Sequence, residues 1–279
     1  MLCACGHPTK ETELATGIAG PGRAQIDART LRTDRWWLYP AAMAGILGFF
    51  VVYATVRIFM NDDYWAADEH YLTPIYSPCI SDSCVEGSSH FGTFLPEMPV
   101  FIPIALITFV VLAGFRGTCY YYRKAGYRSF FLAPMACAVP EPHKKYTGES
   151  KLPLILLNVH RYFFYFAFIF GAINIYDAIL AFHGQDGGVG IGLGTIIIWI
   201  NLVMLWAYTL SCHACRHVVG GRLRNFSKHP WRYRYWTLVS KLNTRHGQFA
   251  MISLFTVIAT DAYIMAISAD WFSDPRIIN

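Results

Sequence analysis

Charged residues are scarce in this chain of 279 residues. Only 15% of them are Asp, Glu, Lys or Arg, whereas 54% are hydrophobic and 16% are aromatic. A soluble domain is typically about a quarter charged, so this composition argues against one. The sequence also lacks a P-loop, a glycine-rich dinucleotide turn and any evident internal repeat. These absences argue against the common soluble nucleotide-dependent enzymes.

Five long apolar runs are present instead. They lie at 38–60, 98–122, 152–182, 189–219 and 249–269, and each is long enough to cross a bilayer, which takes about 20 residues. The first run begins too late, and lacks the small-residue cleavage pattern, to be a removable signal peptide. The sequence predicts an all-α, polytopic membrane protein whose five transmembrane helices form an up-down bundle. Residues 1–35 would be an arm, 36–270 the transmembrane domain and 271–279 a tail.

The distribution of charge predicts the orientation in a bacterial cytoplasmic membrane. The segments 1–37, 116–161 and 216–248 contain 5, 8 and 8 Lys or Arg residues, which is 21 of the 23 in the chain. The segment 61–97 contains seven acidic residues and no Lys or Arg. Because positive residues stay on the cytoplasmic side, the N-terminal arm should be cytoplasmic and the C-terminal tail outside. The basic and aromatic residues of 222–236 should then contact lipid headgroups or a protein partner rather than nucleic acid.

Ligand-competent side chains are concentrated where the fourth apolar run meets a basic segment. The stretch SCHACRHVVGG contains Cys212, His213, Cys215 and His217. In a continuous helix Cys212 and Cys215 would lie about 60° apart on one face, close enough to share a metal. Polar side chains at membrane depth are costly and usually mark a site. This density favours a redox or metal site over buried structural thiols and histidines in headgroup water.

Three further residues should reach the same depth. Cys119 ends the second apolar run, His160 lies near the start of the third, and His246 lies near the start of the fifth. Since four helices would supply the ligands, the site would form only in the folded bundle. Two other pairings are expected: a Cys79–Cys84 disulfide in the acidic loop, and an ion pair between Arg57 and a carboxylate from the outward half of another helix (Asp177 or Asp261).

The pattern resembles the single-chain, five-helix membrane anchor of actinobacterial succinate:quinone oxidoreductases, a relative of fumarate reductase anchors. The matching segments are RGTCYYYRKAGYRSFFLAPMAC, NVHRYFFYF, SCHACRHVVGG and LNTRHGQFA, within residues 36–270. The resemblance implies that a flavoprotein subunit and an iron–sulfur subunit dock on the cytoplasmic face. Electrons from succinate would then reach a membrane quinone, with menaquinone the expected acceptor. This chain alone should oxidise nothing, and a higher oligomer of the complex is left open.

The histidine pattern departs from the di-haem members of that wider family. The first two apolar runs contain no histidine, and the outer leaflet offers only His183, so a distal haem lacks ligands. A single haem b from His160, His213 and His246 stays an alternative, but it leaves the thiols at the same depth unexplained. A Rieske-type [2Fe–2S] cluster uses both residue types, with two thiolates on one iron and two imidazoles on the other. Its ligands would be two of Cys119, Cys212 and Cys215 and two of His160, His213 and His246.

A quinone site is expected beside this centre. Tyr120, Arg161, Trp206 and His217 are its candidate residues, because a quinone needs aromatic walls and a few hydrogen-bond donors. From a different functional class, a metal or solute transporter would use the same Cys and His residues to bind its substrate.

Overall fold

A computed structural model of the chain describes residues 32–99, 101–139, 151–152, 154–184 and 187–278. Most of the predicted N-terminal arm, residues 1–31, lies outside the described residues. The chain divides into two compact units. The first contains Met1–Phe49 and Tyr120–Leu156, and the second contains Phe50–Cys119 and Leu157–Asn279. The second unit therefore carries nearly all of the candidate residues.

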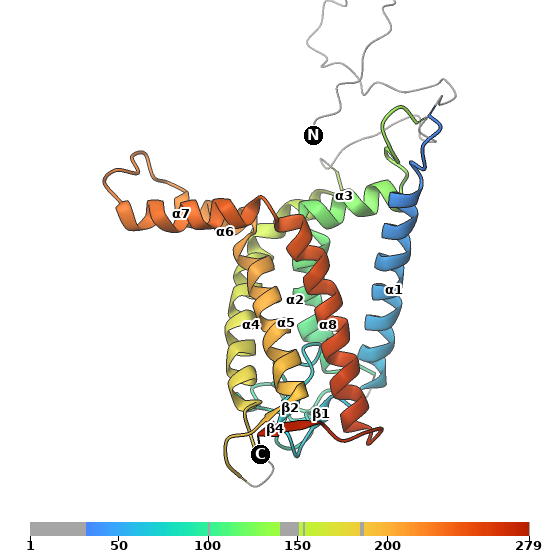
Figure 1. Ribbon diagram of the computed structural model, residues 1–279, viewed down its shortest axis with the longest axis vertical. Coiled ribbons are helices and arrows are strands. Elements are labelled where there is room, and N and C mark those ends of the chain that lie inside the picture. Colours follow the sequence, from blue (N-terminus) through green and yellow to red (C-terminus); the bar gives the residue numbers. More distant parts are fainter. Residues whose placement is uncertain (1–31, 100, 140–150, 153, 185–186, 279) are drawn as a thin grey trace, which may run out of the picture. The chain divides into compact units, whose positions relative to one another are not determined.

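The described residues are mostly helical, as the sequence predicts (Figure 1). The helices are α1 (Leu38–Met60), α2 (Ala105–Gly117), α3 (Tyr120–Ser129), a 3₁₀-helix (Leu154–Val159), α4 (His160–Leu180), α5 (Leu193–Leu210), α6 (His213–Gly220), α7 (Pro230–Asn243) and α8 (His246–Ser268). Four short strands pair antiparallel in two ribbons: β1 (Trp65–Ala66) with β2 (Tyr71–Leu72), and β3 (Ile191–Gly192) with β4 (Arg276–Ile278). The expected tail at 271–279 therefore contributes a strand.

Four helical segments of the described chain are long and apolar enough to cross a membrane. They are Leu38–Met60, Leu154–Leu180, Leu193–Leu210 and His246–Ser268. A fifth span is obtained if α2 and α3 count together as one bent segment. The first predicted run, 38–60, coincides with α1, whereas two of the other predicted runs contain breaks that a straight helix does not have.

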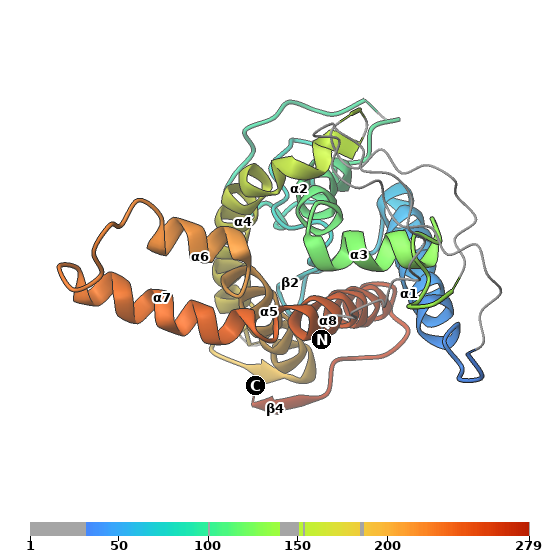
Figure 2. The same ribbon diagram turned by 90° about the horizontal axis from the view of Figure 1, so that it is seen from above.

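Four helices of the second unit, α2, α4, α5 and α8, run side by side (Figures 1 and 2). α5 packs against both α4 and α8, and α2 packs against α4. Small residues permit these close approaches, as is usual between membrane helices. A Cβ atom on Gly114 of α2 would lie 2.3 Å from the ring of Phe163 in α4, and one on Gly171 would lie 3.3 Å from the ring of Trp206 in α5.

The second predicted run, 98–122, is wrong as a single helix. Helix α2 begins only at Ala105, after two prolines at positions 99 and 103, and ends at Gly117. The hydroxyl of Thr118 bonds back to the carbonyl oxygen of Gly114 at 2.6 Å. Such back-bonding by threonine competes with the helical backbone and bends helices, so Cys119 lies in the break before α3.

The fourth predicted run, 189–219, is wrong in the same way. Helix α5 ends at Leu210, and Cys212 has an extended backbone (φ −67°, ψ 146°) as the N-cap of α6. Its sulfur accepts a hydrogen bond from the backbone N–H of Ala214 at 3.3 Å. The two cysteines predicted to share one helix face are therefore separated: Cys212 precedes α6, and Cys215 lies inside it.

The helices α6 and α7 were not predicted as separate elements. Figures 1 and 2 show both extending sideways, away from α4 and α5, at the end where α8 begins. Pro230 occupies the first turn of α7, where its missing N–H costs nothing. Several large side chains of α7 are exposed, including Trp231 (67%) and Tyr235 (60%). We call this end of the second unit, with α6, α7 and the first residue of α8, the basic end.

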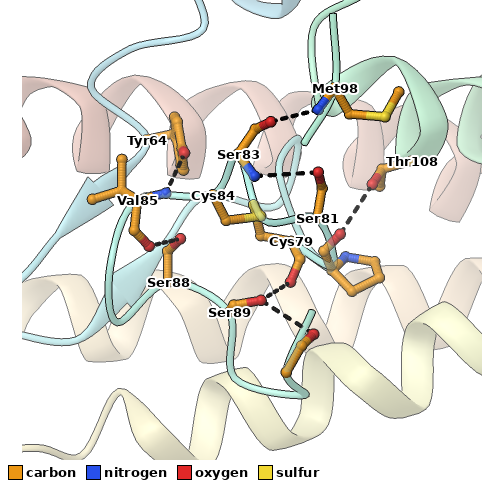
Figure 3. Close-up of a disulfide and its surroundings, with 12 residues drawn as sticks. Tyr64, Cys79, Ser81, Ser83, Cys84, Val85, Ser88, Ser89, Met98 and Thr108 are labelled. Carbon is orange, nitrogen blue, oxygen red and sulfur yellow. Dashed lines mark hydrogen bonds between the residues drawn. A yellow bond between two sulfur atoms is a disulfide. The ribbon is translucent and has the colours of Figure 1, made fainter. Parts of the chain in front are cut away.

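The opposite end, which we call the acidic end, contains the loop 61–97 and both strand pairs. The predicted Cys79–Cys84 disulfide is confirmed (Figure 3). Around it the loop bonds to itself through serine hydroxyls: Ser89 donates to the carbonyl of Cys79 at 2.7 Å. The side chains of Tyr71 and Tyr76 in this loop are fully inaccessible. This end is thus a folded cap on the helices.

The predicted ion pair of Arg57 is confirmed, with Asp261 as its partner. Arg57 Nε lies 2.7 Å from Asp261 Oδ2, and both side chains are almost completely buried. The hydroxyl of Tyr53 donates to the same carboxylate oxygen at 2.6 Å. The other candidate, Asp177, bonds instead to His90, with 2.7 Å between Oδ1 and Nδ1.

Candidate redox site

Two cysteines meet two histidines at the basic end of the second unit. Cys119 Sγ lies 3.5 Å from His246 Nε2, and Cys212 Sγ lies 3.0 Å from His160 Nε2. Each cysteine lies in the break after a membrane helix, and each histidine is the first residue of one. Cys119, Cys212 and His246 are each 1% exposed. Four helices, α2, α4, α5 and α8, therefore deliver four ligand-competent side chains to one buried place.

Hydroxyl groups fix the orientation of both imidazoles. The hydroxyl of Thr118 donates its only proton to a backbone carbonyl and lies 2.9 Å from His160 Nδ1. The hydroxyl of Ser211 likewise donates to the carbonyl of Tyr208 at 3.0 Å and lies 2.7 Å from His246 Nδ1. Because neither hydroxyl has a second proton, each accepts from Nδ1–H. In the neutral form of each ring Nε2 is then the unprotonated nitrogen, and its lone pair faces a thiol.

Aromatic rings cover both histidines. Phe115 stacks on His160 with 4.9 Å between ring centroids and 4° between planes, and Tyr208 stacks on His246 at 5.1 Å and 10°. The two covering rings also contact each other, at 5.2 Å. The stacks cover one face of each imidazole and restrict its rotation.

The guanidinium of Arg116 lies beside these rings. Its Cζ is 4.9 Å from the centroid of Tyr208, and its nitrogens donate to the carbonyls of Ala250 and Ser253 and to the hydroxyl of Ser253 at 3.1–3.3 Å. Arg116 is 8% exposed. The site therefore combines two thiols, two neutral imidazoles and one nearby positive charge.

The arrangement contains a short internal repeat that was not predicted from the sequence. Residues 115–119 read FRGTC and residues 208–212 read YTLSC, each an aromatic residue, two spacers, a hydroxyl residue and a cysteine. In both copies the aromatic ring stacks on a histidine and the hydroxyl holds that ring's Nδ1, while the cysteine faces the other histidine. This short pattern was the available signal that Cys119 and Cys212 are equivalent.

Two predicted ligands lie near this cluster but outside its two Cys–His contacts. His213 is the first residue of α6 and is exposed, and Cys215 is a buried free cysteine inside the same helix. No hydrogen bond joins either side chain to the other four in the described part of the chain. Within that part, no three His, Cys, Asp or Glu side chains converge to hold a single metal ion. The four side chains come as two Cys–His pairs.

The four predicted quinone residues do not share one pocket. Arg161 and His217 line a surface pocket of about 320 Å³ at the basic end. Trp206 lines a different, central cavity of about 60 Å³ together with Phe115, Arg116 and Tyr208. Tyr120 begins α3 in the first unit, is 53% exposed and lies under Arg123, whose Cζ is 5.7 Å from its ring centroid.

Comparison with known proteins identifies the family. A family model for the actinobacterial succinate dehydrogenase subunit SdhC matches residues 38–270. The chain belongs to this family. It is also similar to a chain of the Mycobacterium smegmatis Sdh1 complex in the apo form, with 58% sequence identity, a TM-score of 0.85, and coverage of 95% of this chain and 100% of that chain. None of the curated proteins compared matches it.

Membership of the SdhC family confirms the predicted resemblance. The chain is a membrane subunit of a succinate dehydrogenase complex and a multi-pass protein of the bacterial cytoplasmic membrane. The enzymatic activity belongs to the complex, whose soluble subunits are the partners of this chain.

Proposed function

We propose that this SdhC chain anchors the flavoprotein and iron–sulfur subunits and conducts their electrons to membrane quinone. In this proposal Cys119, Cys212, His160 and His246 hold a Rieske-type [2Fe–2S] cluster. The observation that carries the proposal is the convergence of these four side chains from four helices, three of them buried, with both imidazoles oriented by hydroxyls.

The side chains fit such a group in number and kind. Each iron of a Rieske centre takes two protein ligands, so two Cys and two His suffice without a three-residue site. A metal-binding histidine almost always donates a hydrogen bond from the ring nitrogen that does not bind the metal. The Nδ1 atoms of His160 and His246 make such bonds, to the hydroxyls of Thr118 and Ser211. Each thiol contacts an imidazole in the structure. A bound cluster would lie between the thiols and the imidazoles, so these direct contacts would be lost.

When bound, the cluster would take up and release one electron at a time. The chain supplies the surroundings that make this workable in a bilayer. Two neutral imidazoles leave less negative charge to bury than four thiolates would. Arg116 adds a compensating positive charge nearby, and the stacked rings of Phe115 and Tyr208 give the site apolar walls.

A haem b anchor fits these residues less well. The unprotonated nitrogens of His160 and His246 face sulfur atoms at 3.0 and 3.5 Å, and Phe115 and Tyr208 cover the rings. The adjacent central cavity is about 60 Å³, whereas sites for ligands of that size are several hundred Å³. Neither histidine lines that cavity.

The charge distribution supports an orientation with the basic end toward the cytoplasm. Eight Lys or Arg residues lie in 216–248, which includes the second half of α6 and all of α7, while the acidic end carries seven acids in 61–97. By the positive-inside rule the docked subunits would lie at the basic end, beside the cluster residues. Electrons would then cross only a short distance from the docked iron–sulfur subunit. Menaquinone is the proposed acceptor.

Metal analysis of the purified complex tests the ligand set. We expect Cys119→Ser to remove two iron atoms and two acid-labile sulfides per complex relative to the unmodified protein. The matched control is Cys215→Ser, which also removes a buried thiol and should leave the iron content unchanged. Equal iron in Cys119→Ser and the unmodified complex would contradict the proposal.

A further inference from the structure

Two cavities of the second unit share a wall. The central cavity, about 60 Å³, adjoins the rings that cover the cluster residues. A smaller cavity, about 20 Å³, lies toward the acidic end. Pro74, Asn174 and Leu205 line both. One water needs about 10–15 Å³ by this measure, so the small cavity has room for one water and the central cavity for several.

One face of α4 lines this route along its length. Ala167, Gly171 and Asn174 of α4 line the central cavity, and Asn174 and Asp177 line the smaller one. Their spacing of four, three and three residues places them on one face of the helix. The route therefore follows a single stripe of α4 from the cluster toward the acidic end, and the stripe becomes polar on the way.

The smaller cavity contains an unsatisfied polar atom. Thr260 is 1% exposed, and its Oγ1 has no hydrogen-bond partner among the described residues. Asn174, Asp177 and Asn201 line the same cavity. A buried hydroxyl without a protein partner usually bonds to water, and these neighbours give such a water the two or more further partners it needs.

At the acidic end the route reaches an imidazole–carboxylate pair. Asp177 Oδ1 lies 2.7 Å from His90 Nδ1, and its second oxygen accepts from the hydroxyl of Ser77. The other ring nitrogen of His90, Nε2, is buried and has no hydrogen-bond partner within the described part of the chain. His90 lies in the acidic-end loop, directly before the exposed residues 91–94. An imidazole and a carboxylate in contact can pass a proton between surface and interior.

We propose that these two cavities form a hydrated proton path from the acidic-end surface, through His90 and Asp177, to the central cavity beside Arg116. This inference rests on the proposed function: the path supplies the protons that quinone reduction consumes. Succinate oxidation releases two protons and two electrons at the docked subunits: succinate → fumarate + 2 H⁺ + 2 e⁻. Quinone reduction consumes both: quinone + 2 e⁻ + 2 H⁺ → quinol. The path draws the consumed protons from the acidic side.

Proton counting in vesicles tests the path. The whole complex is reconstituted into liposomes containing a trapped pH dye and a potassium ionophore, with a quinone in the bilayer. Succinate added outside reaches only complexes whose docked subunits face outward, so their acidic ends face the lumen. We expect the lumen to become alkaline by two protons per succinate oxidised. If the protons came from the basic side, lumenal pH would stay constant, which would overturn the proposal.

Variants assign the route. Asp177→Asn should slow lumenal proton uptake roughly tenfold or more, as loss of a proton-transferring side chain typically does. Asp270→Asn, which neutralises an exposed acid at the same end, is the matched control and should leave uptake unchanged. If Asp177→Asn does not assemble, Thr260→Val removes the unsatisfied hydroxyl at nearly constant shape and should slow uptake severalfold. Normal uptake in Asp177→Asn, or in Thr260→Val where that variant replaces it, overturns the path.

The same samples separate this proposal from the proposed function. The reduced complex is examined by electron paramagnetic resonance. Asp177→Asn should retain the cluster signal of the unmodified complex while its lumenal proton uptake is slowed. Absence of a cluster signal in the unmodified complex would refute the proposed redox centre but not the proton path, which the lumenal pH change measures independently.

Discussion

Breaking the buried ion pair of Arg57 and Asp261 should strongly destabilise the second unit. Removing one partner of such a pair leaves an uncompensated charge and typically costs about 3–5 kcal/mol. In Asp261→Asn, Arg57 still donates to the carbonyls of Asp62 and Asp63 at 3.2 and 3.1 Å, which favours the lower value. In Arg57→Met, the carboxylate loses its charged partner and keeps the hydroxyl of Tyr53 as a donor, which favours the higher one.

Thermal unfolding of the purified complex in detergent measures the effect. At roughly 2–4 °C per kcal/mol for a unit of this size, Tm should fall by about 6–20 °C, more in Arg57→Met than in Asp261→Asn. The double variant should recover much of the loss, since two neutral side chains leave no buried charge. Asp270→Asn is the control, because that aspartate is exposed and its backbone φ of 56° suits asparagine. Single variants no less stable than this control would refute the reasoning.

Three further outcomes concern the acidic end. Replacing Cys79 and Cys84 by serine should destabilise it by about 2 kcal/mol, measured as earlier protease cleavage of the loop. Gly194→Ala should lower Tm, because the new Cβ would lie 2.3 Å from the buried ring of Tyr71 and such overpacking costs about 1–3 kcal/mol; an unchanged Tm would contradict the packing. Burial lowers the pKa of His70 from 6.5. Above about pH 6.5 the imidazole is neutral in both the folded and the unfolded protein, and as the pH falls toward the pKa of the folded state, protonation favours the unfolded state and the acidic end loses stability. Hydrogen exchange of the loop measures this loss.

The apolar runs predicted the helices but not their breaks. Hydropathy falls after Thr118–Cys119 and Ser211–Cys212, where the more polar helices α3 and α6 begin. Such a fall predicts the end of an apolar run, but it does not predict that a new helix begins directly after a break. The interruption comes from hydroxyls that bond to the preceding turn, at 2.6 Å for Thr118 and 3.0 Å for Ser211. Hydroxyl residues also occur inside unbroken helices, so the sequence alone does not distinguish the two outcomes.

The predicted site contained the residues that the structure brings together, but not the choice among them. The sequence offered three cysteines and three histidines at similar depth. The choice of Cys212 over Cys215 depends on the break before α6. The prediction of one continuous helix there did not separate the two cysteines. The roles of Thr118 and Ser211 depend on contacts between residues 35–42 positions apart. Helical spacing contains no information about such contacts.

Electron paramagnetic resonance of the dithionite-reduced complex is the most direct test of the proposed cluster. We expect a Rieske-type signal of low average g in the unmodified complex, retained in Cys215→Ser and His213→Ala and lost in Cys212→Ser and His246→Ala. Each pair removes the same kind of side chain from the same end of the second unit, so general damage would not separate them. Stoichiometric haem b without that signal, or a signal that survives in Cys212→Ser and His246→Ala, would contradict the proposed centre.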